Sequence, residues 1–139
     1  MKRKQKKPLT ITKLKEKIDD LLLEKLKSER GDKCELCGGR NQLGLFHVLS
    51  KGSHPRLRCH ERNLLIAGWF CCHFIFHHDF YIARDRIIPK IKELLGEDYE
   101  EQLWALERTL PILDRMELES IYENLKAERS AANGNSSRR

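Results

Sequence analysis

Outside residues 34–79 the sequence contains no cysteine and no histidine, so all five cysteines and all six histidines fall within one central segment. Thiolates and imidazoles are ligands that zinc prefers, and imidazole titrates near neutral pH. A chance distribution would not place all of these side chains together. We therefore expect a metal site, a catalytic site, or both in this segment.

The sequence also lacks an apolar run long enough for a signal peptide or a membrane span, and the basic start MKRKQKK leads into polar residues. We therefore expect a cytoplasmic protein with no membrane partner. Five cysteines, an odd number, do not suit a framework of disulfides. In a reducing compartment, paired cysteines near histidines are better interpreted as metal ligands.

Acidic residues are too few to balance the basic ones, and the formal charge is +6 at pH 7 with an isoelectric point near 9.1. This balance favours a polyanionic partner such as nucleic acid, although a soluble helical protein with a solvated, charge-rich surface would show the same composition. The 139 residues suit a single domain over 10–130. A basic flexible arm (1–9) is expected before it, and a small, polar, disordered tail (131–139) after it.

Helices are predicted on both sides of the central segment. Between residues 10 and 30, apolar residues recur at steps of three and four, which is typical of an amphipathic helix that Thr10 or Thr12 caps and Gly31 ends. Residues 81–130 contain three further apolar sets and are predicted as a helical extension. We interpret these helices as most of the hydrophobic core, because a short hairpin cannot supply it.

A cysteine pair opens the central segment (31–80). Cys34 and Cys37 form a C-x2-C-G pattern typical of a zinc knuckle, which needs a second pair of ligands elsewhere. Residues 43–49 and 64–67 are predicted as the two strands of a hairpin. The basic loop between them carries Lys51, Arg56, Arg58 and Arg62.

Two histidines four residues apart, His73 and His77, follow on a predicted helix that starts at Cys71. That spacing places both imidazoles on one face of the helix, where they can bind one cation. The alternative is a partly buried aromatic stripe with Phe74 and Phe76, which is the weaker interpretation when a cysteine pair lies upstream.

The order of His47 at a strand end, Asn63 at the next strand and the histidine pair on a helix resembles the ββα-metal core of the HNH endonucleases. The resemblance covers roughly the central segment. It is greatest to small phage proteins of the lambda NinG recombination-nuclease type, in which an arginine stands five residues before the asparagine, as Arg58 does here. It implies an α+β, mostly helical fold around a ββα-metal core with a zinc knuckle, in the cytoplasm of a bacterium or a phage-infected host.

The same resemblance implies a role for each residue. Phosphodiester hydrolysis needs an activated water, a Lewis acid and groups that hold the phosphate. His47 would be the general base, and Asn63 would tie the loop to the hairpin and so orient it. His73 and His77 would bind one divalent cation, Mg²⁺, Mn²⁺ or Zn²⁺. The expected phosphate contacts are Arg58, Arg56 and Lys51.

Two departures from the family pattern affect the metal sites. Many HNH enzymes have Asp or His immediately before the general base, where this sequence has Phe46. The cation would then be bound by the histidine pair, water and substrate, or would also take His47 as a ligand. Gly68 and Cys71 stand where the family has a cysteine pair. The expected structural zinc ligands are therefore Cys34, Cys37 and Cys72, with Cys71 or Cys59 as the fourth.

Three functions are compatible with these patterns. The first is a metal-dependent DNA endonuclease that acts on double-stranded or branched DNA, for which a homodimer would suit symmetric cleavage. The second is a zinc-stabilised DNA-binding module without cleavage activity, favoured by Phe46 and the altered knuckle. The third is a helical interaction protein that uses zinc only as a staple.

Overall fold

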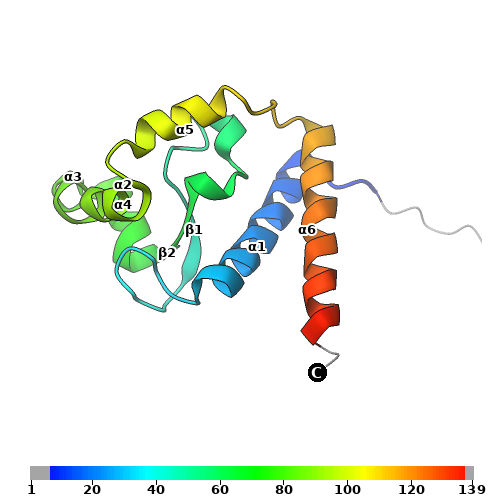
Figure 1. The fold of residues 1–139 in the computed structure, drawn as a ribbon, viewed down its shortest axis with the longest axis horizontal. Coiled ribbons are helices and arrows are strands. Elements are labelled where there is room, and N and C mark those ends of the chain that lie inside the picture. Colours follow the sequence, from blue (N-terminus) through cyan, green and yellow to red (C-terminus); the bar gives the residue numbers. More distant parts are fainter. Residues whose placement is uncertain (1–6, 137–139) are drawn as a thin grey trace, which may run out of the picture.

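The computed structural model describes residues 7–136, which form a two-stranded antiparallel hairpin enclosed by helices (Figure 1). Helices α1 (Ile11–Arg30) and α6 (Arg115–Ser136) pack against each other on one side. The shorter helices lie toward the other side: α2 (Phe74–His78), α3 (Phe80–Ile82), α4 (Ile88–Leu95) and α5 (Tyr99–Glu107). The fold is α+β and mostly helical, as predicted. None of the described helices combines the length and apolar character that crossing a membrane requires.

Helix α1 forms where the sequence predicts it. The side chain of Thr10 accepts a hydrogen bond from the backbone N–H of Lys13 (3.1 Å) and so caps the first turn. Gly31 ends the helix with a φ of 102°, a conformation that favours glycine. The apolar face of α1 is buried through Leu14, Ile18, Leu21, Leu22 and Leu26.

The hairpin pairs β1 (Leu43–His47) with β2 (Leu64–Gly68), and every residue of β2 is buried. Successive side chains of a strand point to opposite faces, so the two strands contribute to two separate hydrophobic clusters. Residues that pack with α4 and α5 are Phe46, Leu65 and Ala67. Residues that pack with α1 and α6 are Leu45, Leu64 and Ile66, and Leu43 packs against both clusters.

Strand β1 is two residues shorter than the predicted 43–49. It ends at His47 because the side chain of Asn63 bonds both backbone groups of Leu49, which would otherwise continue the ladder. The connecting loop then turns through two short 3₁₀ segments, Pro55–Leu57 and Glu61–Asn63.

A wide, π-helical turn (Trp69–His73) follows β2 and leads into α2. A second one, Ala83–Ile87, precedes α4. The predicted helical extension 81–130 is interrupted at residues 96–98 and 108–114, on either side of α5. Helix α6 continues to Ser136, so residues 131–136 are helical where the sequence predicted a disordered tail. Alanine, a strong helix former, occupies 131 and 132 and favours this continuation. Residues 1–6 of the predicted arm and 137–139 lie outside the described part.

Candidate functional site

Four cysteines from two distant segments meet beside the hairpin. Cys34 and Cys37 lie in the turn after α1, and Cys71 and Cys72 lie in the π-helical turn after β2. Their Sγ atoms all lie within 4.8 Å of one another. Four thiolates bound to one zinc ion by bonds of about 2.3 Å lie about 3.8 Å apart. The cluster can therefore hold a structural metal such as zinc with little adjustment.

The backbone at Gly68 makes room for this cluster. A Cβ atom at Gly68 would lie 2.5 Å from Sγ of Cys71 and 3.1 Å from the carbonyl oxygen of Asn41. Any larger residue would therefore displace the thiol. The glycine that interrupts the cysteine pattern of the sequence is thus the residue against which Cys71 packs.

Glu35 fastens the first cysteine pair to the hairpin. Its backbone N–H donates to the carbonyl of Ile66 (2.8 Å), and its Oε2 accepts from the N–H of the same residue (2.7 Å). Nη1 of Arg30 donates to that carboxylate (3.3 Å). These bonds hold the turn in register with β2, and sequence reasoning had assigned no role to Glu35.

Cys59, the other candidate for the fourth zinc ligand, is not a member of the cluster. It lies in the connecting loop and packs against the hydrophobic cluster of α1 and α6. Burial raises the pKa of its thiol to about 11. Of the two alternatives that the sequence left open, Cys71 is the cysteine that lies with Cys34, Cys37 and Cys72.

A separate cleft of about 340 Å³ collects three histidines from the hairpin and the helix that follows it. His47 reaches it from the end of β1, His73 from the π-helical turn and His77 from α2. Helix α1 contributes Asp19 and Asp20 to the lining. Other lining residues are Leu23, Gly44, Leu45, Ser50 and Lys51. The structure thus brings together the histidines that the sequence placed on a strand and a helix.

The orientation of His47 leaves one ring nitrogen without a bond to the protein backbone. Its Nε2 lies 3.0 Å from the carbonyl oxygen of Arg58. A carbonyl only accepts, so Nε2 carries the proton and Nδ1 keeps its lone pair. Burial lowers the pKa of His47 to about 4, and the positive charges of Lys51 and Arg58 act in the same direction. The imidazole is therefore neutral at pH 7, as a proton acceptor must be.

His73 and His77 lie with ring centroids 5.2 Å apart, one helical turn from each other. Phe46 is fully buried beneath them, and its ring meets those of His73 and Phe76 edge-on at 5.5 and 5.0 Å. It belongs to the core rather than to the cleft. Among the residues that the structure describes, the four cysteines are the one group of three or more ligand side chains close enough to hold a metal.

Arg58 is engaged in an ion pair across the cleft wall. Its Nη2 lies 2.8 Å from Oδ2 of Asp19, and both side chains are largely shielded from solvent. The arginine expected to contact phosphate therefore contacts α1 in this structure. Of the other two expected phosphate contacts, Lys51 is exposed at the cleft and Arg56 is half-buried in the loop.

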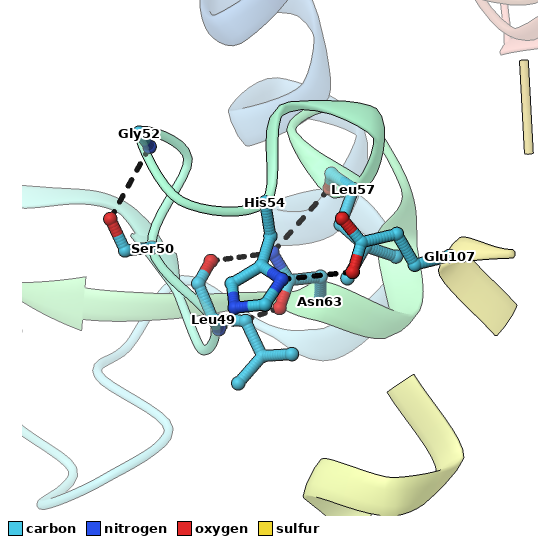
Figure 2. A network of polar contacts seen from close by, with 7 residues as sticks. All are labelled: Leu49, Ser50, Gly52, His54, Leu57, Asn63 and Glu107. Carbon is cyan, nitrogen blue, oxygen red and sulfur yellow. Dashed lines mark hydrogen bonds and ion pairs between the residues drawn. The ribbon is translucent and has the colours of Figure 1, made fainter. Parts of the chain in front are cut away.

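The loop between the strands is fixed by a buried amide (Figure 2). Asn63, with no solvent exposure, accepts a hydrogen bond from the N–H of Leu49 (2.7 Å) and donates to its carbonyl (3.0 Å). The same Nδ2 lies 3.4 Å from the carbonyl of Leu57. His54 in turn pairs with Glu107 of α5 through Nδ1 at 2.8 Å. The loop that follows His47 is thus held at three points.

Asp19, Asp20 and Glu107 are site residues that the sequence analysis missed. Asp19 and Asp20 belong to the polar face of an amphipathic helix, where carboxylates are ordinary and point to no partner. The one signal in the sequence is that both directly follow Ile18, which belongs to the apolar face of the helix. No protein-family model, curated protein or solved structure matches this chain.

Removal of one cluster thiol should release the metal. We expect Cys34→Ala to lose bound zinc and to unfold at a lower temperature, because zinc binding to such sites contributes on the order of 10 kcal/mol to folding. Cys59→Ala is the matched control and should keep one zinc per chain. Zinc content and thermal unfolding of the two purified variants measure this. A wild-type protein that contains no zinc and unfolds at the same temperature with and without a chelator would contradict this prediction.

Asn63→Ala should destabilise the fold by about 3 kcal/mol, because both backbone groups of Leu49 would lose buried partners. Ser50→Ala serves as the control: it removes an exposed bond to the N–H of Gly52 (3.3 Å) and should change the stability by less than about 0.5 kcal/mol. Urea unfolding of both variants provides the comparison. Equal losses would show that the buried amide is not an anchor.

The neutral His47 predicts a pH dependence of stability. Its pKa in the folded chain, about 4, lies below the ordinary value of 6.5, so the unfolded chain takes up the proton first as the pH falls. Stability should therefore decrease between pH 6.5 and 4, and more steeply in wild type than in His47→Gln, which keeps a donor for the carbonyl of Arg58. Lys51, Arg58, His73 and the carboxylates Asp19 and Asp20 surround this group in both proteins. Parallel slopes in urea titrations would refute the prediction.

Proposed function

We propose that this protein is a metal-dependent endonuclease that hydrolyses phosphodiester bonds in DNA. The observation that carries the proposal is the cleft that a neutral His47, with a free Nδ1 lone pair, shares with the pair His73 and His77. A proton acceptor and two imidazoles in one cleft are the parts that hydrolysis with one metal ion requires.

The side chains of the cleft would have the following roles in the reaction. His47 accepts a proton from the attacking water at Nδ1, while the carbonyl of Arg58 holds Nε2–H and thereby the ring. Lys51, exposed at the cleft, contacts the phosphate. A divalent cation held by His73 and His77, and completed by water and substrate, would stabilise the charge on the phosphate and the leaving oxygen.

We assign Arg58 a different role from the phosphate contact that the family resemblance implied. Its guanidinium neutralises Asp19, so that this carboxylate at the cleft does not repel a phosphate. Its carbonyl orients His47. We therefore propose Arg58 as a positioning residue rather than as the first phosphate contact.

The four cysteines support this function structurally. A zinc ion bound there would clamp the turn after α1 to the first turn before α2, and so fix the helix that carries His73 and His77. The net positive charge of +6 suits a polyanionic substrate. Branched DNA as the preferred substrate, and a homodimer that cuts it symmetrically, rest on the family resemblance of the central segment alone.

A second candidate is a zinc-stabilised DNA-binding module without cleavage. It is favoured by Phe46, which is buried in the core where a carboxylate or histidine ligand would strengthen cation binding. Such a module would bind DNA in a salt-dependent manner in any metal and yield no product.

His47→Ala should reduce DNA cleavage by at least about 100-fold, because it removes the general base. Supercoiled plasmid and a synthetic four-way junction are incubated with Mg²⁺, Mn²⁺, Ni²⁺ or Zn²⁺, and products are measured on gels. His60→Ala, a loop histidine that does not line the cleft, should cleave like wild type. Cleavage that survives in His47→Ala would remove this residue from the base role. DNA binding without product from wild type in every metal would favour the binding module.

A further inference from the structure

The exposed apolar side chains of this protein are concentrated after the hairpin. Ten large hydrophobic residues are exposed in the part of the chain that the structure describes, and five of them fall between residues 69 and 81. All five are aromatic: Trp69, Phe70, Phe74, Phe80 and Tyr81. Two other apolar residues of this segment, Ile75 and Phe76, pack against the core. The segment thus exposes five of its six Trp, Phe and Tyr rings.

Two of these rings belong to a continuous strip that begins at the cleft. The ring of His73, which lines the cleft, lies 5.0 Å from that of Trp69. Trp69 lies 6.0 Å from Phe74, and Phe74 stacks on His78 at 4.2 Å. We call Trp69, Phe74 and His78 the aromatic strip. Trp69 and Phe74 keep 44% and 43% of their surface exposed, so both still offer surface to a ligand.

The composition of this surface indicates what it binds. Aromatic rings are also enriched in protein interfaces, so aromatic character alone does not identify the ligand. The basic side chains near the strip favour unpaired nucleobases, which stack on aromatic rings regardless of sequence. Lys51 lines the cleft at which the strip begins, and Arg84 and Arg86 follow the exposed aromatic residues in the sequence. Arg84 lies over the rings of Phe80 and Tyr81, at 5.8 and 5.2 Å.

We propose that the aromatic strip binds unpaired bases of a single-stranded DNA segment next to the cleft. This inference rests on the proposed nuclease function for its substrate, and it specifies that substrate as DNA with unpaired bases beside the phosphate to be cut. Bases leave the cleft past His73 and stack on Trp69 and then on Phe74. The phosphates are held at the cleft by Lys51.

The fluorescence of Trp69 tests this directly. In a Trp104→Phe protein, Trp69 is the one remaining tryptophan of the chain. It is titrated, without added divalent metal, with a 15-nucleotide oligothymidylate and with an abasic strand of the same length, which has the phosphates without the bases. We expect the thymidylate to quench the fluorescence and to bind about tenfold more tightly than the abasic strand. Equal affinities and no quenching would overturn the proposal.

Variants then locate the contact. Trp69→Ala and, separately, Phe74→Ala should each weaken thymidylate binding about tenfold and leave binding of the abasic strand unchanged. Trp104→Ala, which removes a tryptophan of similar exposure (41%) from α5, should change neither. Thermal unfolding confirms that the variants are folded. Trp69 belongs to the π-helical turn that carries Cys71 and Cys72. If Trp69→Ala does not fold, Phe74→Ala still tests the aromatic strip.

The outcomes separate this proposal from the proposed function. Quenching by thymidylate in a protein that cleaves nothing would support the aromatic strip and refute the nuclease. Cleavage by a protein whose thymidylate binding is unaffected by both substitutions would refute the strip and leave the nuclease standing. A self-association that Trp69→Ala abolishes, without any quenching by DNA, would show that the strip joins two copies of the chain and would also overturn the proposal.

Discussion

The burial of strand β2 on both faces is the constraint on which the rest of this structure depends. Two strands of five residues have little stability by themselves, and here they are stabilised because each face belongs to a different hydrophobic cluster. A shift of one residue in the pairing would exchange the two faces and bury the wrong side chains in both clusters. The register therefore places His47 toward α1 and its neighbour Phe46 in the opposite cluster.

This constraint links the two candidate sites. The chain leaves the buried strand at Gly68 and immediately forms the π-helical turn that carries Cys71, Cys72 and His73. This turn thus contributes Cys71 and Cys72 to the cysteine cluster and His73 to the histidine cleft. A metal in the first site would fix the geometry of the second, although no ligand is shared.

Sequence reasoning succeeded where the signals are local. The helix that ends at Gly31 was predicted with Thr10 or Thr12 as its cap, and the two strands were also predicted, because capping residues and apolar spacing act within a few residues. The placement of Cys71 rather than Cys59 beside the other cysteines could not be derived from spacing. A π-helical turn accommodates an extra residue in a helix, and only the folded backbone shows where it lies.

Contacts between residues far apart in the chain could not be predicted from the sequence. Arg58 and Asp19 are 39 residues apart, and no sequence pattern around either residue indicates the other as its partner. The early end of β1 likewise follows from a buried amide, not from the propensities of the residues that leave the strand.

The three anchors of the connecting loop also separate its ends from its tip. Asn63 fixes Leu49 and Leu57, and Glu107 fixes His54, whereas residues 51–53 between them are exposed. Changes of length or sequence at that tip would leave the anchored parts of the loop in place, but they would alter Lys51, which lines the histidine cleft. The tip is therefore the part of the loop at which the charge beside the cleft can vary while the three histidines keep their positions.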